Sequence, residues 1–262
     1  MQNFKILIAG YGVVGKHIYE ELSVFNPDIF DKYMRLDNRR NSHYDFEFIC
    51  VDTPLDAEYS TCLDTTEVNL TLQENSADVY VIKSTCPLGF TSCAKFATDK
   101  HIVYSPEYYG DTPHCTKQDF NFTILGGDNQ DCIAVQQLLQ YCYDASHKFY
   151  ITDSTTAELV KFMENSWIAT KVSFCTQFYE IAKQHNIDYE KLRELFIADP
   201  RVNPSHTFVY RDTPYWDSKC LNKDVIDIAN SEESATLLCD IIKYNNIQKE
   251  RYKDATGNTE NI

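Results

Sequence analysis

Lys161 and Asn165 stand four residues apart in a stretch whose composition is typical of a helix. This spacing puts an ammonium and a carboxamide on one helical face, one turn apart. Further along the chain, Cys220 is followed within five residues by Lys223 and Asp224. Two hydrogen-bond donors, a thiol and a carboxylate could together carry out the oxidation of a carbonyl through a covalent intermediate.

The N-terminal segment supplies a site for a matching electron acceptor. Gly10, Gly12 and Gly15 form a GxGxxG motif, with Val13 and Val14 between them, after a predicted strand and before a predicted helix. The glycines permit a tight turn and let the backbone approach a pyrophosphate at the helix N-terminus. We expect Asp37 at the end of the second strand, about 20 residues past the motif, where a carboxylate holds both ribose hydroxyls. This acid favours NAD over NADP as the cofactor.

Short apolar runs alternate with helical patterns over roughly the first 150 residues. The predicted strands are Phe4 to Ala9, Lys32 to Leu36, Phe46 to Val51, Asp78 to Ile82, Ile102 to Tyr104, Phe122 to Leu125 and Lys148 to Ile151. Helices are predicted at Val13 to Phe25 and at Asn129 to Tyr141. This alternation predicts an α/β fold with a doubly wound, Rossmann-type sheet as an NAD-binding domain over residues 1–151.

The pattern changes to helix alone after Ile151, which predicts an all-helical domain over residues 152–262. One helix is expected from Ser154 to Gln184, with apolar residues at helical spacing: Val160, Met163, Trp167, Phe174, Phe178 and Ile181. Shorter helices are expected at Tyr189 to Ala198, Asp224 to Ala229 and Glu233 to Asn246, followed by a frayed polar end from Lys249. The long helix exceeds the usual ~8–20 residues, so we expect it to form a homodimer, the alternative being an intramolecular connector.

Composition excludes several classes of partner. A formal net charge of −15 argues against nucleic acid and against an anionic membrane surface. No apolar run approaches the ~20 residues of a membrane span. The 10 cysteines are scattered without a paired CxxC and without ligand-like spacing to histidine, which predicts reduced thiols and no metal site. The first residues are read as a strand and not as a signal peptide, so a cytoplasmic location is expected.

With these residues in place, the chain resembles the UDP-glucose/GDP-mannose 6-dehydrogenase family. The matching motifs run in order along the chain: Gly10 to Gly15, Phe48 to Pro54, Val81 to Gly89, Tyr104 to Glu107, Ala157 to Asn165, Asp199 to Arg201, and Cys220 with Lys223 and Asp224. In such enzymes a sugar C6 alcohol is oxidised twice to a carboxylate, with two NAD and a covalent thioester. The resemblance therefore implies a nucleotide-sugar substrate.

The resemblance also implies a role for individual residues. Cys220 would be the nucleophile, Lys161 and Asn165 would steady the oxyanion, and Asp224 would hold a water that Thr85 helps to order. Glu107 would act on the water that hydrolyses the thioester, while Lys223 and Arg201 would contact substrate, Arg201 from across the dimer interface. Thr53, Pro54 and Thr85 would contact the cofactor, together with Gly10, Gly12, Val13, Val14, Gly15 and Asp37.

Three departures from the family pattern leave two alternative functions open. Asp217 and Ser218 stand where the family has glycines beside the sugar, and Asn222 replaces a proline. The family's C-terminal nucleotide-binding domain is expected to be absent, because the chain ends soon after Asn246. One alternative is therefore a non-catalytic NAD-binding dimerisation module. Another is a single-step dehydrogenase of the β-hydroxyacid type, which uses the helical lysine but needs no cysteine.

Overall fold

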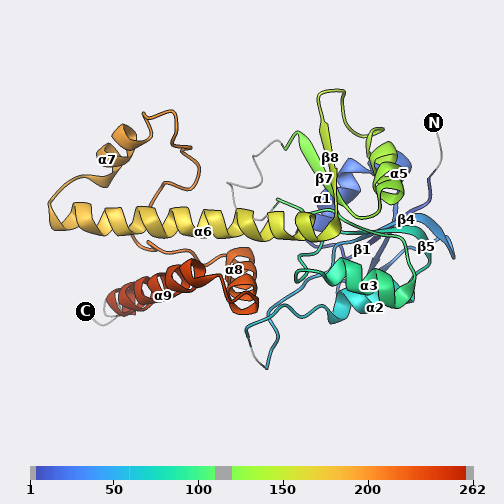
Figure 1. Cartoon of the computed structure of the whole chain (residues 1–262), viewed down its shortest axis with the longest axis horizontal. Coiled ribbons are helices and arrows are strands. Elements are labelled where there is room, and N and C mark those ends of the chain that lie inside the picture. Colours follow the sequence, from blue (N-terminus) through green and yellow to red (C-terminus); the bar gives the residue numbers. More distant parts are fainter. Residues whose placement is uncertain (1–3, 59, 110–119, 258–262) are drawn as a thin grey trace. The chain divides into compact units, whose positions relative to one another are not determined.

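The computed structural model describes residues 4–58, 60–109 and 120–257 of the chain (Figure 1). It divides into two compact units. Unit 1 falls within Met1–Glu58 and Leu63–Lys161, and unit 2 within Tyr59–Cys62 and Phe162–Ile262.

Unit 1 is built on a single sheet of eight strands in the order β3-β2-β1-β4-β5-β6-β7-β8. The strands are β1 Ile6–Ala9, β2 Asp28–Asp31, β3 Leu36–Asp37, β4 Tyr44–Ile49, β5 Ala77–Ile82, β6 Ile102–Tyr104, β7 Phe122–Gly126 and β8 Lys148–Thr152. The five strands from β2 to β6 in this order run parallel. β3 pairs antiparallel with β2, β7 antiparallel with β6, and β8 parallel with β7. The predicted doubly wound α/β fold is confirmed.

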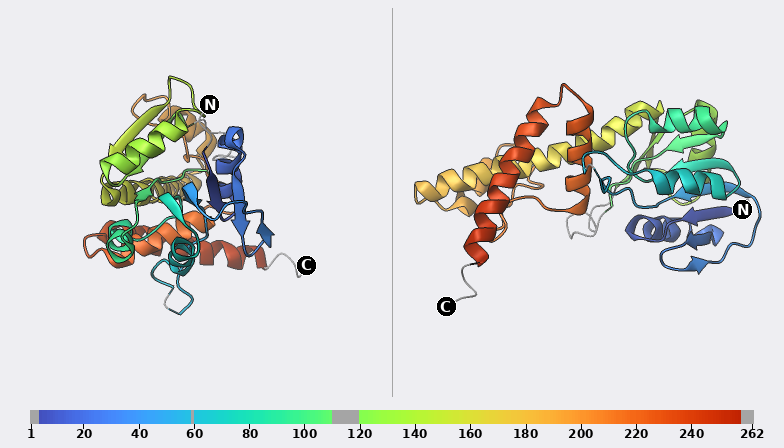
Figure 2. Two further views of the ribbon diagram at one scale, coloured as in Figure 1. Left: turned by 90° about the vertical axis from the view of Figure 1, so that its right-hand side faces the viewer. Right: turned by 90° about the horizontal axis from the view of Figure 1, so that it is seen from below.

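Helices cover both faces of this sheet (Figures 1 and 2). Helices α1 (Val13–Glu21) and α5 (Asn129–Leu139) pack on one face, where Phe46 and Phe48 of β4 point into a shared apolar core. Helices α2 (Thr66–Glu74) and α3 (Phe90–Thr98) pack on the other face, where Ile49 lies in a second core. Alternate residues of one buried strand thus serve two cores, which explains its nearly continuous apolar run.

The second strand lies earlier than its predicted position at Lys32 to Leu36. It spans Asp28–Asp31, and residues 32–35 form a turn. The prediction was wrong because only Ile29 and Phe30 are apolar here, and the strand begins with a buried acid. That acid, Asp28, accepts hydrogen bonds from Arg40 N at 2.6 Å and from the Tyr44 hydroxyl at 2.9 Å.

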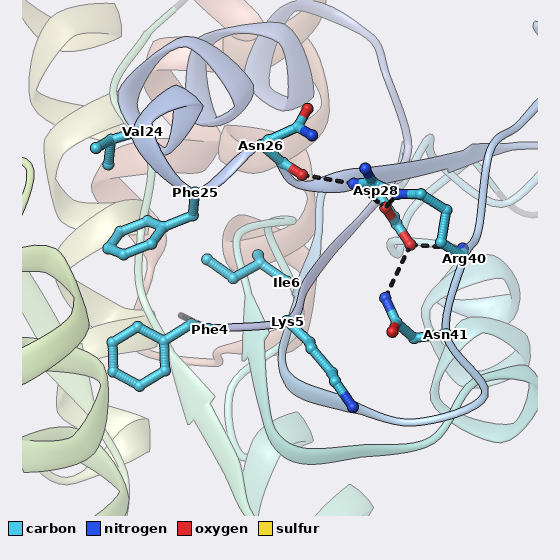
Figure 3. Close-up of a pocket in the computed structure, with 9 residues that line it drawn as sticks. All are labelled: Phe4, Lys5, Ile6, Val24, Phe25, Asn26, Asp28, Arg40 and Asn41. Carbon is cyan, nitrogen blue, oxygen red and sulfur yellow. Dashed lines mark hydrogen bonds and ion pairs between the residues drawn. The ribbon is translucent and has the colours of Figure 1, made fainter. Parts of the chain in front are cut away.

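Arg40 also holds the start of β2, where Asp28 lies (Figure 3). Its guanidinium pairs with Asp28 and donates to Asn26 O at 2.6 Å, beside a surface pocket of about 470 Å³. Burial alone would raise the pKa of Asp28, but the hydrogen bonds from Arg40 and Tyr44 lower it. The carboxylate is therefore satisfied by structural partners and forms part of the wall of the pocket.

The regular elements that the structure describes in unit 2 are all helices, joined by irregular segments. Helix α6 (Ser154–Gln184) leaves unit 1 at Lys161 and continues into unit 2, with the predicted bounds confirmed. It is followed by α7 (Tyr189–Phe196), α8 (Lys219–Ser231) and α9 (Thr236–Gly257). Helix α9 continues to Gly257, so the predicted frayed end from Lys249 is wrong over that stretch. None of the described helices is long and apolar enough to cross a membrane.

A buried carboxyl group, Glu47, lies on β4 in the centre of the sheet. Its Oε1 accepts a hydrogen bond from Asn75 Nδ2 at 2.8 Å, whereas its Oε2 is buried with no hydrogen-bond partner among the described residues. Burial raises the pKa of Glu47 to about 8, against the opposing effects of Asn75, Lys100 and Arg39. The folded protein therefore holds a proton that the unfolded chain releases at lower pH.

This carboxyl predicts a specific pH dependence of stability. Because its folded pKa lies above the unfolded value of 4.5, stability falls as the pH rises from about 4.5 to about 8. The loss amounts to roughly 3–6 kcal/mol over this whole interval. Glu47→Gln, which is neutral at every pH, is expected to make the melting temperature less dependent on pH between pH 5 and 8. The exposed Glu20→Gln is the control, and an equal slope in Glu47→Gln and wild type would contradict the assignment.

Candidate functional site

The glycine loop joins β1 to α1 at the carboxyl end of β1. Gly10 has φ +90°, and a Cβ there would lie 2.6 Å from Cys50 O. A Cβ on Gly15 would lie 1.9 Å from Gly10 O, so both positions require glycine. At Gly12, the N-cap of α1, a Cβ would meet nothing within 4 Å. Open space beside Gly12 and the unbonded first-turn N–H groups of a helix fit a dinucleotide pyrophosphate.

Asp31, and not Asp37, ends the strand beside this loop. β2 ends at Asp31 next to β1, and Tyr11 N donates a hydrogen bond to Asp31 Oδ2 at 2.7 Å. Asp37 lies on β3, where Arg39 Nε donates to its Oδ1 at 2.9 Å and Arg39 NH2 to its Oδ2 at 2.7 Å. The prediction that Asp37 ends the second strand is wrong, because the chain turns at residues 32–35 before it reaches Asp37. The signal that could have identified Asp31 is an acid directly after Ile29-Phe30.

The loops after β4 and β5 lie at the same sheet edge as the glycine loop. These strands run parallel to β1, so their carboxyl ends meet there. Thr53 follows β4 and Thr85 follows β5, and both side chains are buried. Ser84 Oγ donates to Val51 O at 2.6 Å and joins the two loops. In the sheet, β2 lies on one side of β1 and β4 on the other, so the strand order reverses at β1. Ligands of doubly wound sheets bind at such a switch point, at the carboxyl ends of the strands.

The first two turns of α6 are anchored to unit 1 by Glu158. Its carboxylate is fully buried and accepts hydrogen bonds from Gly89 N at 2.6 Å and Thr91 N at 2.9 Å, at the N-terminus of α3. Lys161 follows one turn later, and its ammonium lies 5.2 Å from the centre of the Tyr108 ring. The face of an aromatic ring attracts an ammonium at this distance through a cation–π contact.

Glu107, at the end of the Tyr104 to Glu107 motif, is paired with a lysine that sequence reasoning missed. Lys83 Nζ lies 3.4 Å from Glu107 Oε2 and donates to Ser105 Oγ at 3.1 Å. Lys83 stands in the matched Val81 to Gly89 motif, but no spacing rule connects it to Glu107.

In unit 2, a buried carboxylate joins two predicted site residues. Asn165 Nδ2 donates to Asp224 Oδ2 at 2.5 Å, and Lys223 Nζ donates to Asp224 Oδ1 at 2.9 Å. The exposed fraction of the Asp224 side chain is 1%. Asn165 comes from α6 and Asp224 from α8, so this carboxylate ties the two helices together.

Cys220 is exposed in the first turn of α8, one turn before Asp224. Spacing of four residues puts the thiol and the carboxylate on one face of the helix. Ser218, the N-cap of α8, accepts a hydrogen bond from Leu221 N at 3.3 Å. The side chain at this position is therefore used to begin the helix that carries Cys220.

The other residue in place of a family glycine, Asp217, is turned toward α9. Its Oδ1 accepts from Lys249 Nζ at 2.5 Å and from Asn222 Nδ2 at 2.9 Å. Burial alone would raise the pKa of Asp217, but Lys249 and Asn222 lower it. Asn222, which replaces the family's proline, thus holds Asp217 in a polar cluster.

The preceding residue, Trp216, fixes the backbone of this loop. Its N–H donates to Asn245 Oδ1 at 2.9 Å, and its carbonyl accepts from Asn245 Nδ2 at 2.9 Å. Its indole N–H donates to Ser173 Oγ at 3.0 Å. The loop that leads to Cys220 is therefore held by both α6 and α9.

Arg201 is exposed and lies against its neighbour Asp199. Arg201 Nε donates to Asp199 Oδ1 at 3.0 Å and NH2 to Asp199 Oδ2 at 2.6 Å. This pair lowers the pKa of Asp199. Within one chain the guanidinium thus has a local partner, and a contact across a dimer interface stays a prediction.

The predicted residues fall into two groups. Unit 1 holds the glycine loop with Val13 and Val14 in the first turn of α1, the loops of Thr53, Pro54 and Thr85, and the side chains of Glu107 and Lys161. Unit 2 holds Asn165, Arg201, Cys220, Lys223 and Asp224. Among the residues that the structure describes, no group of three or more His, Cys, Asp or Glu is arranged to hold a metal ion.

Comparison with known proteins identifies the helical segment. Residues 155–246 match the model of the UDP-glucose/GDP-mannose dehydrogenase family, central domain. A curated relative, UDP-glucose 6-dehydrogenase of Campylobacter jejuni, is 26% identical over 225 residues, which cover 81% of this chain and 56% of the relative. The resemblance predicted from the motifs is confirmed, and the chain spans about half the length of this relative.

Two solved structures show the same fold. A UDP-glucose dehydrogenase from Pyrobaculum islandicum has a TM-score of 0.78 at 18% identity, covering 94% of this chain and 68% of its own. The 3-hydroxyisobutyrate dehydrogenase of Mycobacterium tuberculosis has a TM-score of 0.66 at 12% identity, covering 97% of this chain and 95% of its own.

The Asp224 cluster predicts a large effect on stability. Asp224→Ala removes the acceptor shared by Asn165 and Lys223 from a buried position, which is expected to cost about 2–4 kcal/mol. The melting temperature in thermal unfolding should fall by several degrees. Asp212→Ala, at an exposed position, is the control. Equal melting temperatures of the two variants would show that the cluster does not stabilise the fold.

Proposed function

We propose that this chain, whose residues 155–246 belong to the central domain of the UDP-glucose/GDP-mannose dehydrogenase family, oxidises a nucleotide sugar with NAD⁺. The observation that carries the proposal is the arrangement on α8. An exposed thiol at Cys220 precedes the buried Asp224 by one turn, and Asp224 holds Asn165 of α6. A nucleophile, a carboxylate and an amide donor are thus joined through two helices, as a covalent oxidation requires.

The sugar alcohol at C6 would be oxidised in two steps. In the first, the alcohol loses a proton and a hydride to give the aldehyde. The Cys220 thiol then adds to the aldehyde carbon and its proton passes to the carbonyl oxygen. Loss of a second hydride and of that proton gives a thioester. Lys161 and Asn165 would donate hydrogen bonds to the oxyanion of the adduct, and Asp224 would hold a water that Thr85 helps to order. NAD⁺ supplies the hydride acceptor in both steps.

Hydrolysis would complete the reaction. A water oxygen bonds to the acyl carbon, the C–S bond breaks, and Glu107 takes a proton from the water. Lys223 and Arg201 would contact the substrate, Arg201 from the other subunit of a dimer. Remote binding energy serves to position the reacting carbon, so contacts to the nucleotide should affect turnover as well as affinity.

The residues of unit 1 fit the dinucleotide. The open face of Gly12 and the first turn of α1 would hold the pyrophosphate, and Asp31 would hold the ribose hydroxyls. Thr53, Pro54 and Thr85 would line the same edge. Arg39 and Arg40 are engaged by Asp37 and Asp28, which favours NAD over a cofactor that carries a 2′-phosphate. With reduced thiols and this cofactor, the reaction is expected in the cytoplasm.

A second candidate function is supported by the likeness of fold. The 3-hydroxyisobutyrate dehydrogenase of Mycobacterium tuberculosis matches 97% of this chain with a TM-score of 0.66. A β-hydroxyacid-type dehydrogenase would use Lys161 as general acid or base for one oxidation, without Cys220. It would form one NADH per substrate.

Helix α6 supports a homodimer. Large apolar side chains are exposed along it in unit 2: Met163, Trp167, Phe174, Phe178 and Ile181. Their spacing puts them on one face, and a second copy of the same helix would cover this apolar stripe.

If α6 forms the dimer interface, a single charge introduced into the apolar stripe should dissociate the dimer. Trp167→Glu is expected to convert the dimer to a monomer in light scattering after gel filtration, because a buried carboxylate would lack a partner. Gln184→Glu introduces the same charge at the end of α6 and should leave the dimer intact. A wild-type monomer, or a dimeric Trp167→Glu, would contradict the assignment.

The two candidate acids predict different effects on the cofactor. Asp31→Asn is expected to raise the Kd of NAD⁺ in calorimetry about tenfold, through loss of charge-assisted hydrogen bonds to the ribose. Asp37→Asn serves as the matched control, since this acid pairs with Arg39, and its Kd should stay within about twofold of wild type. The reverse order of effects would restore Asp37 as the ribose ligand.

Cys220 provides the direct test of the proposed reaction. With NAD⁺ and UDP-glucose, Cys220→Ser is expected to lower carboxylate formation at least about a thousandfold, because a serine hydroxyl is a far weaker nucleophile than a thiolate. Cys239→Ser, at another exposed cysteine, should retain wild-type turnover. One NADH per substrate that survives Cys220→Ala would instead support the β-hydroxyacid-type reaction.

A further inference from the structure

A buried lysine outside the proposed reaction lies beside Glu107. The ammonium of Lys83 is 3.4 Å from Glu107 Oε2, and the exposed fractions of the two side chains are 7% and 9%. Lys83 also donates a hydrogen bond to Ser105 Oγ at 3.1 Å. A buried ammonium at this distance restrains a carboxylate far more than a surface ion pair does.

The other oxygen of Glu107 is held by the backbone. Tyr108 N donates to Glu107 Oε1 at 2.9 Å, and Tyr109 N lies 3.4 Å from the same oxygen. With one oxygen fixed by amides and the other by Lys83, the plane of the carboxylate has a defined orientation.

A second carboxylate near Lys83 has partners of its own. Glu21 Oε1 lies 3.0 Å from His17 Nε2, and the Tyr143 side chain also hydrogen-bonds to Glu21. Burial alone would raise the pKa of Glu21, but His17, Lys83 and Tyr143 lower it. Lys83 therefore acts on Glu21 at longer range and contacts Glu107 directly.

Both members of the pair border a small cavity. Its volume is about 20 Å³, and Lys83, Glu107 and Tyr143 are among the residues that line it. A polar cavity above ~10–15 Å³ is large enough for one water molecule. The site thus joins an oriented carboxylate to a space that fits a water.

We propose that Lys83 is a positioning residue for the hydrolytic half of the reaction, fixing the Glu107 carboxylate toward the water that it activates. This inference rests on the proposed thioester route. In the step concerned, the water oxygen bonds to the acyl carbon, the C–S bond to Cys220 breaks, and Glu107 accepts the proton of the water. Lys83 would act through Glu107, which it contacts directly, and not on the substrate itself.

The test follows the covalent adduct on Cys220 by intact-protein mass spectrometry during turnover with NAD⁺ and UDP-glucose. Lys83→Met is expected to lower turnover about 10- to 100-fold and to accumulate the acyl adduct, as Glu107→Gln should. Lys83→Arg, which keeps the charge, should restore part of the rate. Lys100→Met removes a partly buried lysine that contacts the Tyr80 hydroxyl, and it should accumulate no adduct.

A folded Lys83→Met that loses turnover without accumulating adduct would overturn the proposal. If that variant does not fold, Ser105→Ala is the alternative test, because it removes a hydrogen bond of Lys83 and keeps both charges. Accumulation of the acyl adduct in Ser105→Ala supports the positioning role of Lys83, and absence of the adduct refutes it. A double-mutant cycle on melting temperature with Lys83→Met and Glu107→Gln tests the pair without activity. Additive losses overturn the pairing. If wild type forms no NADH but the double-mutant cycle still shows coupling between Lys83 and Glu107, only the proposed function is refuted.

Discussion

The site in unit 1 depends on the hydrogen bonds that the buried Glu158 carboxylate accepts from the N-terminus of α3. This carboxylate comes from the second turn of α6 and accepts two backbone N–H groups at the N-terminus of α3, at 2.6 and 2.9 Å. A charge at this depth persists only with such partners, and the helix N-terminus adds a favourable field. Lys161 follows one turn later on α6, and Thr85 precedes Gly89 in the loop that Glu158 holds. One carboxylate thereby sets the places of two side chains proposed for catalysis.

The elements with strong periodicity could be predicted from the sequence. The bounds of α6 were predicted correctly because Ser154 to Gln184 contains no proline or glycine and its apolar residues follow helical spacing. The second strand was misplaced because its identity depends on tertiary pairing. A strand with two apolar residues and a buried acid is stabilised by Arg40 and Tyr44, neither of which is local to Asp28. For the same reason, the acid at the end of the second strand is Asp31 and not Asp37.

The candidate site shows the same division between local and distant signals. Lys161, Asn165, Cys220 and Asp224 could be found from motif spacing, and the structure joins Asn165 to Asp224 across two helices. Lys83 could not be found in this way, because its pairing with Glu107 arises from packing after β5 and β6. Nor could spacing foresee that Asp217 and Ser218, in place of glycines, turn to Lys249 and to the N-cap of α8. These two side chains therefore have structural partners within unit 2.

The most direct test of the central claim uses UDP-glucose that carries two deuterium atoms at C6. The account predicts that both deuterium atoms are transferred to NAD⁺, so that each sugar consumed yields two molecules of singly labelled reduced cofactor and a carboxylate without deuterium. Mass spectrometry of the cofactor and the product measures both quantities. A single labelled cofactor per sugar, with one deuterium retained in the product, would contradict the two-step oxidation through Cys220.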